Sequence, residues 1–136
     1  MKNMNNFYKE LGNLFYAVAK SDDKIQPDEK KKIEDLIGFN WKHLENSHDE
    51  FGTDASYIIL FEFETARDRG MTTDQAYDSF AEYFRDNESS LDEALRKRIF
   101  ESCRQIADTY RRINARELEL LEKIQDLLQL NKVHRI

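Results

Sequence analysis

Apolar residues along this chain recur with the spacing of amphipathic helices. Near the start they fall on one face of a helix that should end near Lys20. Its apolar face consists of Phe7, Leu11, Leu14, Phe15 and Val18. Pro27 suits the first position of the next helix, because its missing N–H would have no intrahelical partner there. The apolar stripe of that second helix continues through Ile33, Leu36, Ile37, Trp41 and Leu44.

Residues 57–63 are the ambiguous part of the pattern, because their β-branched and aromatic side chains also suit a strand. Thr53 and Asp54 before them have the character of an N-cap and a first helical turn, and Gly70 after them is a good helix stop. A lone strand in a helical chain would have no partner. The pattern therefore predicts a third helix, buried on more than one side.

Three further helices complete the pattern. Thr72 or Thr73 opens the fourth helix, which should turn Ala76, Phe80, Tyr83 and Phe84 inward. The stretch "SLDE", Ser90 to Glu93, reads as a capping box for the fifth, whose apolar face would be Leu95, Ile99, Cys103, Ile106 and Tyr110. Asn114 to Glu117 has similar capping character before the sixth, with Leu118, Leu121, Ile124, Leu127 and Leu128. We expect an all-α fold, a single compact bundle of about six helices formed by residues 1–136.

A faint internal repeat links the two ends of the chain. Ala19, Ile25, Glu29 and Ile33 recur at one constant offset as Ala107, Ile113, Glu117 and Leu121. The repeat predicts a helix–turn–helix at each end of the bundle. In each copy the isoleucine of the turn, Ile25 or Ile113, should be buried and pack the turn against the core.

Composition narrows the function classes. The 136 residues carry a formal net charge of −6, which argues against nucleic acid as a partner. The basic triplets 30–32 and 96–98 fall within helices and are expected to be solvated faces. No apolar run reaches the length of a membrane span. The single cysteine, Cys103, excludes an internal disulfide, favours a reducing cytoplasmic setting and is expected to be a core residue.

The first copy of the repeat, "YAVAKSDDKIQPDEKKKIEDLI", resembles the TerB-like family associated with tellurite resistance. The second copy, "ADTYRRINARELELLEKIQDLL", and "DEFGTDAS" at 49–56 are similar to other stretches of that family. The resemblance implies an all-helical module in a bacterial stress response. It also implies protein partners, among them a membrane-associated complex, and acidic turn residues as ion ligands. Asp23 stands where the family has glycine, and Tyr110-Arg111 replaces its second Asp-Gly pair.

Asp22, Asp23 and Glu29 are the candidate metal ligands, since carboxylate oxygens suit Ca²⁺ or Mg²⁺. Lys24 and Pro27 break the EF-hand pattern, so ordinary turn and helix-start chemistry explains these acids better than an ion site does. No nucleophile–base order or phosphate-binding glycine loop stands out. The sequence favours a non-enzymatic interaction module without a cofactor. The alternatives are a weak divalent-cation sensor or buffer acting through residues 22–29, and a hydrolase with a di-carboxylate metal site.

Overall fold

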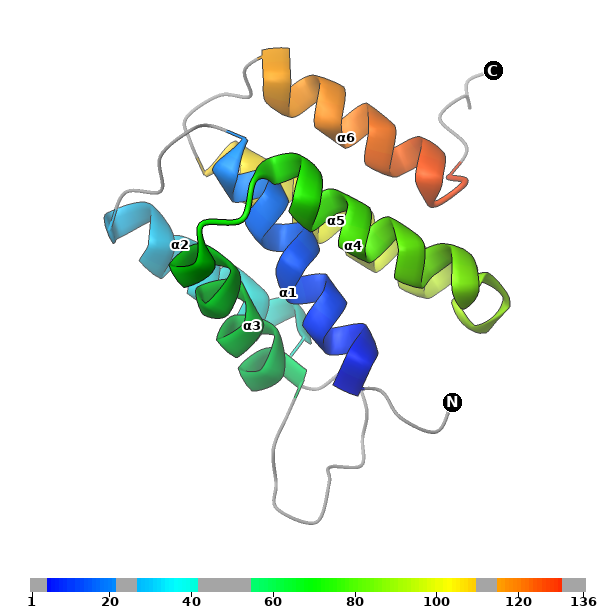
Figure 1. Cartoon of the computed structure of the whole chain (residues 1–136), viewed down its shortest axis with the longest axis horizontal. Coiled ribbons are helices and arrows are strands. Elements are labelled where there is room, and N and C mark those ends of the chain that lie inside the picture. Colours follow the sequence, from blue (N-terminus) through cyan, green and yellow to red (C-terminus); the bar gives the residue numbers. More distant parts are fainter. Residues whose placement is uncertain (1–4, 22–26, 42–54, 110–114, 131–136) are drawn as a thin grey trace.

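The computed structural model describes residues 5–21, 27–41, 55–109 and 115–130, and this part of the chain is all-α, as predicted. Its helices are α1 (Asn5–Lys20), α2 (Pro27–Trp41), α3 (Ala55–Arg69), α4 (Thr73–Asp86), the 3₁₀ turn η1 (Glu88–Ser90), α5 (Glu93–Asp108) and α6 (Ala115–Leu127). Figure 1 shows α1 in the middle of a compact bundle, between α2 and α3 on one side and α4, α5 and α6 on the other.

Several helix boundaries follow from the residues that predicted them. α1 ends at Lys20, and α2 begins at Pro27. Gly70 ends α3 with φ of +69°, a left-handed conformation that favours glycine. Thr72 is the N-cap of α4: the Gln75 amide donates to Thr72 Oγ1, and the Thr72 amide donates to Gln75 Oε1, each at 3.0 Å.

The capping box predicted at Ser90 is wrong. Ser90 ends the 3₁₀ turn η1, and α5 begins two positions later than expected, with Asp92 as its N-cap. The Leu95 amide donates to Asp92 Oδ1 at 2.9 Å. Leu91 between them is buried. The backbone of Leu91 is extended, with φ of −110° and ψ of 103°, so the helix starts after it.

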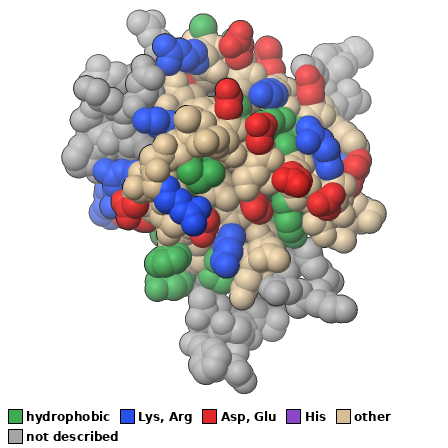
Figure 2. Space-filling model, in the orientation of Figure 1, with side chains coloured by type: hydrophobic (Ala, Val, Ile, Leu, Met, Phe, Trp, Pro, Cys, Tyr) green, Lys and Arg blue, Asp and Glu red, His purple; other side chains and the backbone are tan. Residues whose placement is uncertain are grey.

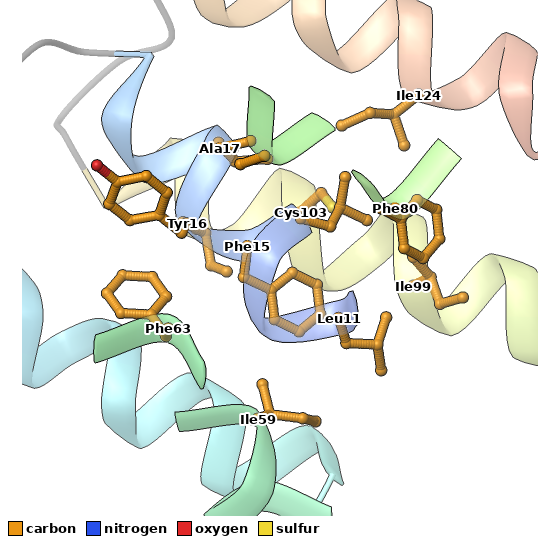
Figure 3. Close-up of a cluster of buried hydrophobic side chains, with 14 of the residues drawn as sticks. Leu11, Phe15, Tyr16, Ala17, Ile59, Phe63, Phe80, Ile99, Cys103 and Ile124 are labelled. Atoms are coloured by element: carbon orange, nitrogen blue, oxygen red, sulfur yellow. The ribbon is translucent and has the colours of Figure 1, made fainter. Parts of the chain in front are cut away.

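The core gathers around α1, whose residues 11–19 are all buried (Figure 3). The α1 side chains in this view meet side chains from α3, α4, α5 and α6: Ile59, Phe63, Phe80, Ile99, Cys103 and Ile124. Cys103 is fully buried, which confirms it as a core residue, and its burial raises the pKa of the thiol. Gly12 permits the close approach of α1 to α3: a Cβ there would lie 2.6 Å from the Ile59 carbonyl oxygen.

α3 is a helix, as predicted, but the expectation that it is buried on more than one side is wrong. Its buried residues, Ala55, Ser56, Ile59, Phe63 and Ala66, share one face. Tyr57 and Phe61 on the opposite face are 64% and 63% exposed. The main packing partners of α3 among the described helices are α1 and α2, and both pack on the side opposite Tyr57 and Phe61.

Two smaller expectations also fail. Leu118 is 52% exposed, whereas Leu120, absent from the predicted stripe of α6, is buried. Arg96 is not part of a solvated face. Its guanidinium donates to the carbonyl oxygens of Leu91 and Glu88, each at 2.8 Å, and lies 5.0 Å from the centre of the Phe84 ring. Arg96 therefore fastens the η1 turn to α5.

The described members of the internal repeat occupy similar environments. Ala19 and Ala107 are fully buried, and Ile33 and Leu121 are buried as well. Glu117 is buried in the first turn of α6. Other predicted positions lie outside the described residues: Ile25 and Ile113 in the turns, Leu44, Thr53, Asp54, Tyr110 and Asn114. The role that the sequence predicts for each of them stays a prediction.

Candidate functional site

The predicted acidic site lies mostly outside the described residues. Asp22 and Asp23 follow the last described residue of the first segment, Ser21. Glu29 falls in the first turn of α2, where the backbone alone is described. Within the described part of the chain, no group of three or more His, Cys, Asp or Glu side chains could hold a metal ion. The site at Asp22, Asp23 and Glu29 therefore stays a prediction.

A pocket opens where three distant parts of the chain meet, and its volume is about 520 Å³. The end of α1, the turn between α3 and α4, and residues 116–123 of α6 form its walls. The turn is anchored on α1, because the Tyr16 hydroxyl donates to the Met71 carbonyl oxygen at 2.8 Å. Thr72 and Thr73 then begin α4 at the pocket wall. Thr72, which the sequence predicts as a helix start, thus also lines this pocket.

The pocket wall is rich in cations. Lys20 comes from the end of α1, and Arg116 and Lys123 come from α6. Two carboxylates, Asp74 and Glu119, also reach it, and Met71 and Leu120 give it an apolar patch. The Lys123 ammonium lies 4.3 Å from the centre of the Tyr77 ring.

The outward face of α3 is a second candidate surface. Tyr57 and Phe61 are one helical turn apart, so their side chains are neighbours on that face. Figure 2 shows hydrophobic side chains at the surface over α3, on the lower left of the view. Beside them, Lys30 of α2 and Glu64 of α3 form an ion pair at 2.9 Å. This pair ties α2 to α3.

A third feature is a groove of about 570 Å³ between α2 and α5. Phe39 and Leu36 supply its apolar wall, and Phe39 is 89% exposed. Lys32, Asp35 and Asp108 surround them with charges of both signs. The same two helices are joined by a buried hydrogen bond, in which Trp41 Nε1 donates to Ser102 Oγ at 3.0 Å.

Charge and hydropathy limit what these surfaces do. On the face seen in Figure 2, Lys and Arg side chains alternate with Asp and Glu without forming one extended patch of a single sign. Such a mixture differs from the continuous basic stripe of a nucleic-acid groove. In the described residues, no helix combines the length and the apolarity needed to cross a bilayer.

Comparison with models of protein families, with curated proteins and with solved structures gives no match to this chain. The resemblance to the TerB-like family therefore remains a prediction from the motifs alone. The all-α fold and the surfaces described above come from the structure itself.

Proposed function

We propose that this protein is a non-enzymatic helical interaction module of a bacterial stress-response system of the tellurite-resistance kind, acting in the cytoplasm through protein partners. The TerB-like motifs and the all-helical bundle support this proposal. The observation that carries it is the outward face of α3, where Tyr57 and Phe61 are mostly exposed side by side.

Two large aromatic side chains on one helical face are costly to leave in water. Single exposed apolar residues are common in soluble proteins, but neighbouring ones form a patch of the kind that partners cover. Ile58 and Leu60, partly buried on either side, extend the apolar character of this face toward the core. Aromatic residues of this size are also the ones that most often dominate protein–protein affinity.

The charge on this face points to the chemistry of the partner. Asp68 lies on the same side of α3 as Phe61, about two turns further along. It takes part in none of the ion pairs found between described residues. The partner that fits is an amphipathic helix of another protein, with an apolar pair for Tyr57 and Phe61 and a basic residue for Asp68.

The test combines survival and crosslinking in cells of the source organism that lack the native gene. Loss of the gene should make them sensitive to tellurite, and the wild-type chain should restore growth. Phe61→Ser should fail to restore it, whereas Phe39→Ser, which removes an even more exposed aromatic side chain from α2, should restore it fully. A photo-crosslinking amino acid at position 61 should trap one partner protein, and Tyr57→Ser should abolish that product.

Three outcomes would overturn this proposal. The first is normal tellurite resistance without the gene. The second is equal growth with Phe61→Ser and Phe39→Ser. The third is a crosslinked product that contains only a second copy of this chain.

The alternative function, a weak divalent-cation sensor or buffer, rests on Asp22, Asp23 and Glu29. The structure bears on it in one respect: α2 begins at Pro27, so Glu29 stands in the first helical turn, close in sequence to the other two acids. A helix start explains an acidic residue there without any ion. The alternative is therefore tested directly with metal ions, as set out among the predictions below.

A further inference from the structure

The described residues that line the pocket between α1, α4 and α6 include more cations than carboxylates. Its wall carries three cationic side chains, Lys20, Arg116 and Lys123, against the carboxylates of Asp74 and Glu119. The whole chain has a formal net charge of −6. Among the described residues of this wall the cations outnumber the carboxylates by one, which favours an anionic ligand, because the walls of a pocket focus the field of their charges.

Lys123 is placed to bind such a ligand. The Tyr77 ring, itself buried, holds the Lys123 ammonium at 4.3 Å from its centre. Lys123 belongs to none of the ion pairs between described residues. A cation–π contact uses one face of the ammonium and leaves N–H donors available on the other. Lys123 therefore offers a positioned positive charge that no carboxylate of the described chain neutralises.

The start of α4 adds donors to the same wall. Thr72, Thr73 and Asp74 line the pocket, so the positive end of the α4 dipole lies at its edge. The capping box occupies the Thr72 and Gln75 amides. The Thr73 and Asp74 amides belong to the first turn, where backbone N–H groups have no intrahelical acceptor. The Asp74 carboxylate opposes this effect, so the cations of α1 and α6 carry the inference and the helix start assists them.

The size and the apolar part of the wall define the rest of the ligand. A volume of about 520 Å³ lies in the range of pockets for small organic molecules. Met71 and Leu120 provide a hydrophobic surface beside the charged groups. We infer that this pocket binds a small organic phosphate monoester, with its dianionic phosphate at Arg116 and Lys123 and its apolar body against Met71 and Leu120.

This inference is independent of the docking face on α3, and its test uses the purified full chain. Isothermal titration calorimetry with phenyl phosphate, inorganic phosphate and neutral benzyl alcohol separates the parts of the ligand. Phenyl phosphate should bind with a dissociation constant below about 1 mM and more tightly than inorganic phosphate, and benzyl alcohol should not bind measurably. Binding should weaken between about 0.05 M and about 0.3 M salt, as expected for a charge-driven contact at a surface pocket.

Matched variants assign the binding to the pocket. Lys123→Gln and Arg116→Gln should each raise the dissociation constant of phenyl phosphate about five- to tenfold, because each removes one charge-assisted contact. Lys9→Gln is the control: it removes the same charge from an exposed position of α1, three turns before Lys20. Thermal melts of all three variants establish that they fold.

Three results would overturn the inference. One is the absence of phenyl phosphate binding in the wild-type chain. Another is equal binding of benzyl alcohol, which would show a hydrophobic site without anion recognition. The last is an equal loss in Lys9→Gln and Lys123→Gln, which would show that phosphate responds to net charge and not to this pocket.

Discussion

α1 and α3 pack against each other, but α1 is buried around nearly its whole circumference, whereas α3 is buried on one face. α3 has the denser apolar run, "YIILFEF", but buries one face and exposes Tyr57 and Phe61. α1 contains Gly12 and Asn13 amid its apolar residues, yet nearly its whole circumference is buried from residue 11 to residue 19. The number of neighbouring helices, rather than hydrophobicity, separates the two.

Packing partners explain the difference. α1 is covered by α3, α4, α5 and α6, whereas α3 packs mainly on α1 and α2. A central helix needs small residues where a neighbour comes close and large ones elsewhere, as Gly12 and Phe15 illustrate. An outer helix needs only one apolar face for folding. The exposed aromatic residues of α3, Tyr57 and Phe61, thus lie outside the core.

The largest expected effect contrasts one phenylalanine from each helix. Phe15→Ala in α1 should lower the free energy of unfolding by about 3–5 kcal/mol, because it leaves a cavity in the centre of the bundle. Phe61→Ala on the exposed face of α3 should change it by no more than about 0.5 kcal/mol. Urea denaturation measures both. Similar losses for the two variants would mean that the outward face of α3 supports the fold.

Glycine substitutions give the next effect. Gly12→Ala would place a Cβ 2.6 Å from the Ile59 carbonyl oxygen and 2.8 Å from Glu62 Cβ, so α1 and α3 must move apart. We expect a loss of about 1–3 kcal/mol from overpacking. Gly38→Ala in α2 is the control, because its Cβ would meet nothing within 4 Å. That variant should gain about 0.5–1 kcal/mol from helix propensity, and a gain at both sites would contradict the close approach.

A smaller effect concerns the hydroxyl of Tyr16, which α1 directs to the turn after α3. Tyr16→Phe removes the 2.8 Å hydrogen bond to the Met71 carbonyl oxygen. The expected cost is about 1 kcal/mol, typical of one lost hydrogen bond. Tyr83→Phe in α4 is the matched control and should cost less, because the Tyr83 hydroxyl donates no hydrogen bond to the described residues. Thermal melts at neutral pH compare the two variants, and an equal cost would show that the anchoring bond adds nothing.

The same tyrosine makes stability depend on alkaline pH. Burial raises the pKa of Tyr16, and it does the same for Tyr77 and Tyr83. In unfolded chains tyrosine titrates near pH ~10. Above that pH the unfolded state binds fewer protons than the folded state, so the free energy of unfolding falls as pH rises. Urea melts from neutral to alkaline pH should show this fall, with a smaller slope for Tyr16→Phe than for the wild type.

The smallest effect is expected at the acidic segment that follows α1. Asp22→Ala should change the free energy of unfolding by no more than about 0.5 kcal/mol in metal-free buffer. By contrast, Ile25→Ala and Ile113→Ala should cost about 2–5 kcal/mol each, because each isoleucine is expected to pack its turn against the core.

Titration with Ca²⁺, Mg²⁺, Mn²⁺ and Zn²⁺ should shift the melting temperature little below millimolar concentration. A large shift abolished by Asp22→Ala would favour the cation sensor instead.

The sequence predicted helix boundaries well where a single residue determines the backbone conformation. Pro27 starts a helix, Gly70 ends one, and Thr72 caps the next, as the sequence indicated. The prediction failed at α5: Ser90 belongs to the η1 turn and Leu91 is extended, so the N-cap falls on Asp92 and not on Ser90. It failed again on α3, because periodicity does not reveal how many neighbours a helix has.

The pocket was beyond sequence analysis for a related reason. Lys20, Arg116 and Lys123 come from the two ends of the chain, and the turn at Thr72 comes from its middle. No spacing rule links residues so far apart, and isolated lysines and arginines are usual on any helix surface. The one available signal, the N-cap at Thr72, indicated a helix start and not a cavity. Their convergence depends on how α6 lies across the bundle.

The buried position of Cys103 also makes the chain a reporter of its own opening. The thiol lies in the core beside residues of α4 and α6 (Figure 3), so a thiol reagent cannot reach it while the bundle is closed. When opening is fast relative to the reaction, the labelling rate measures the population of molecules with an open core. A single cysteine gives one unambiguous signal, since no second thiol competes for the reagent. Mass spectrometry of the intact chain over time would thus yield the free energy of opening without any denaturant.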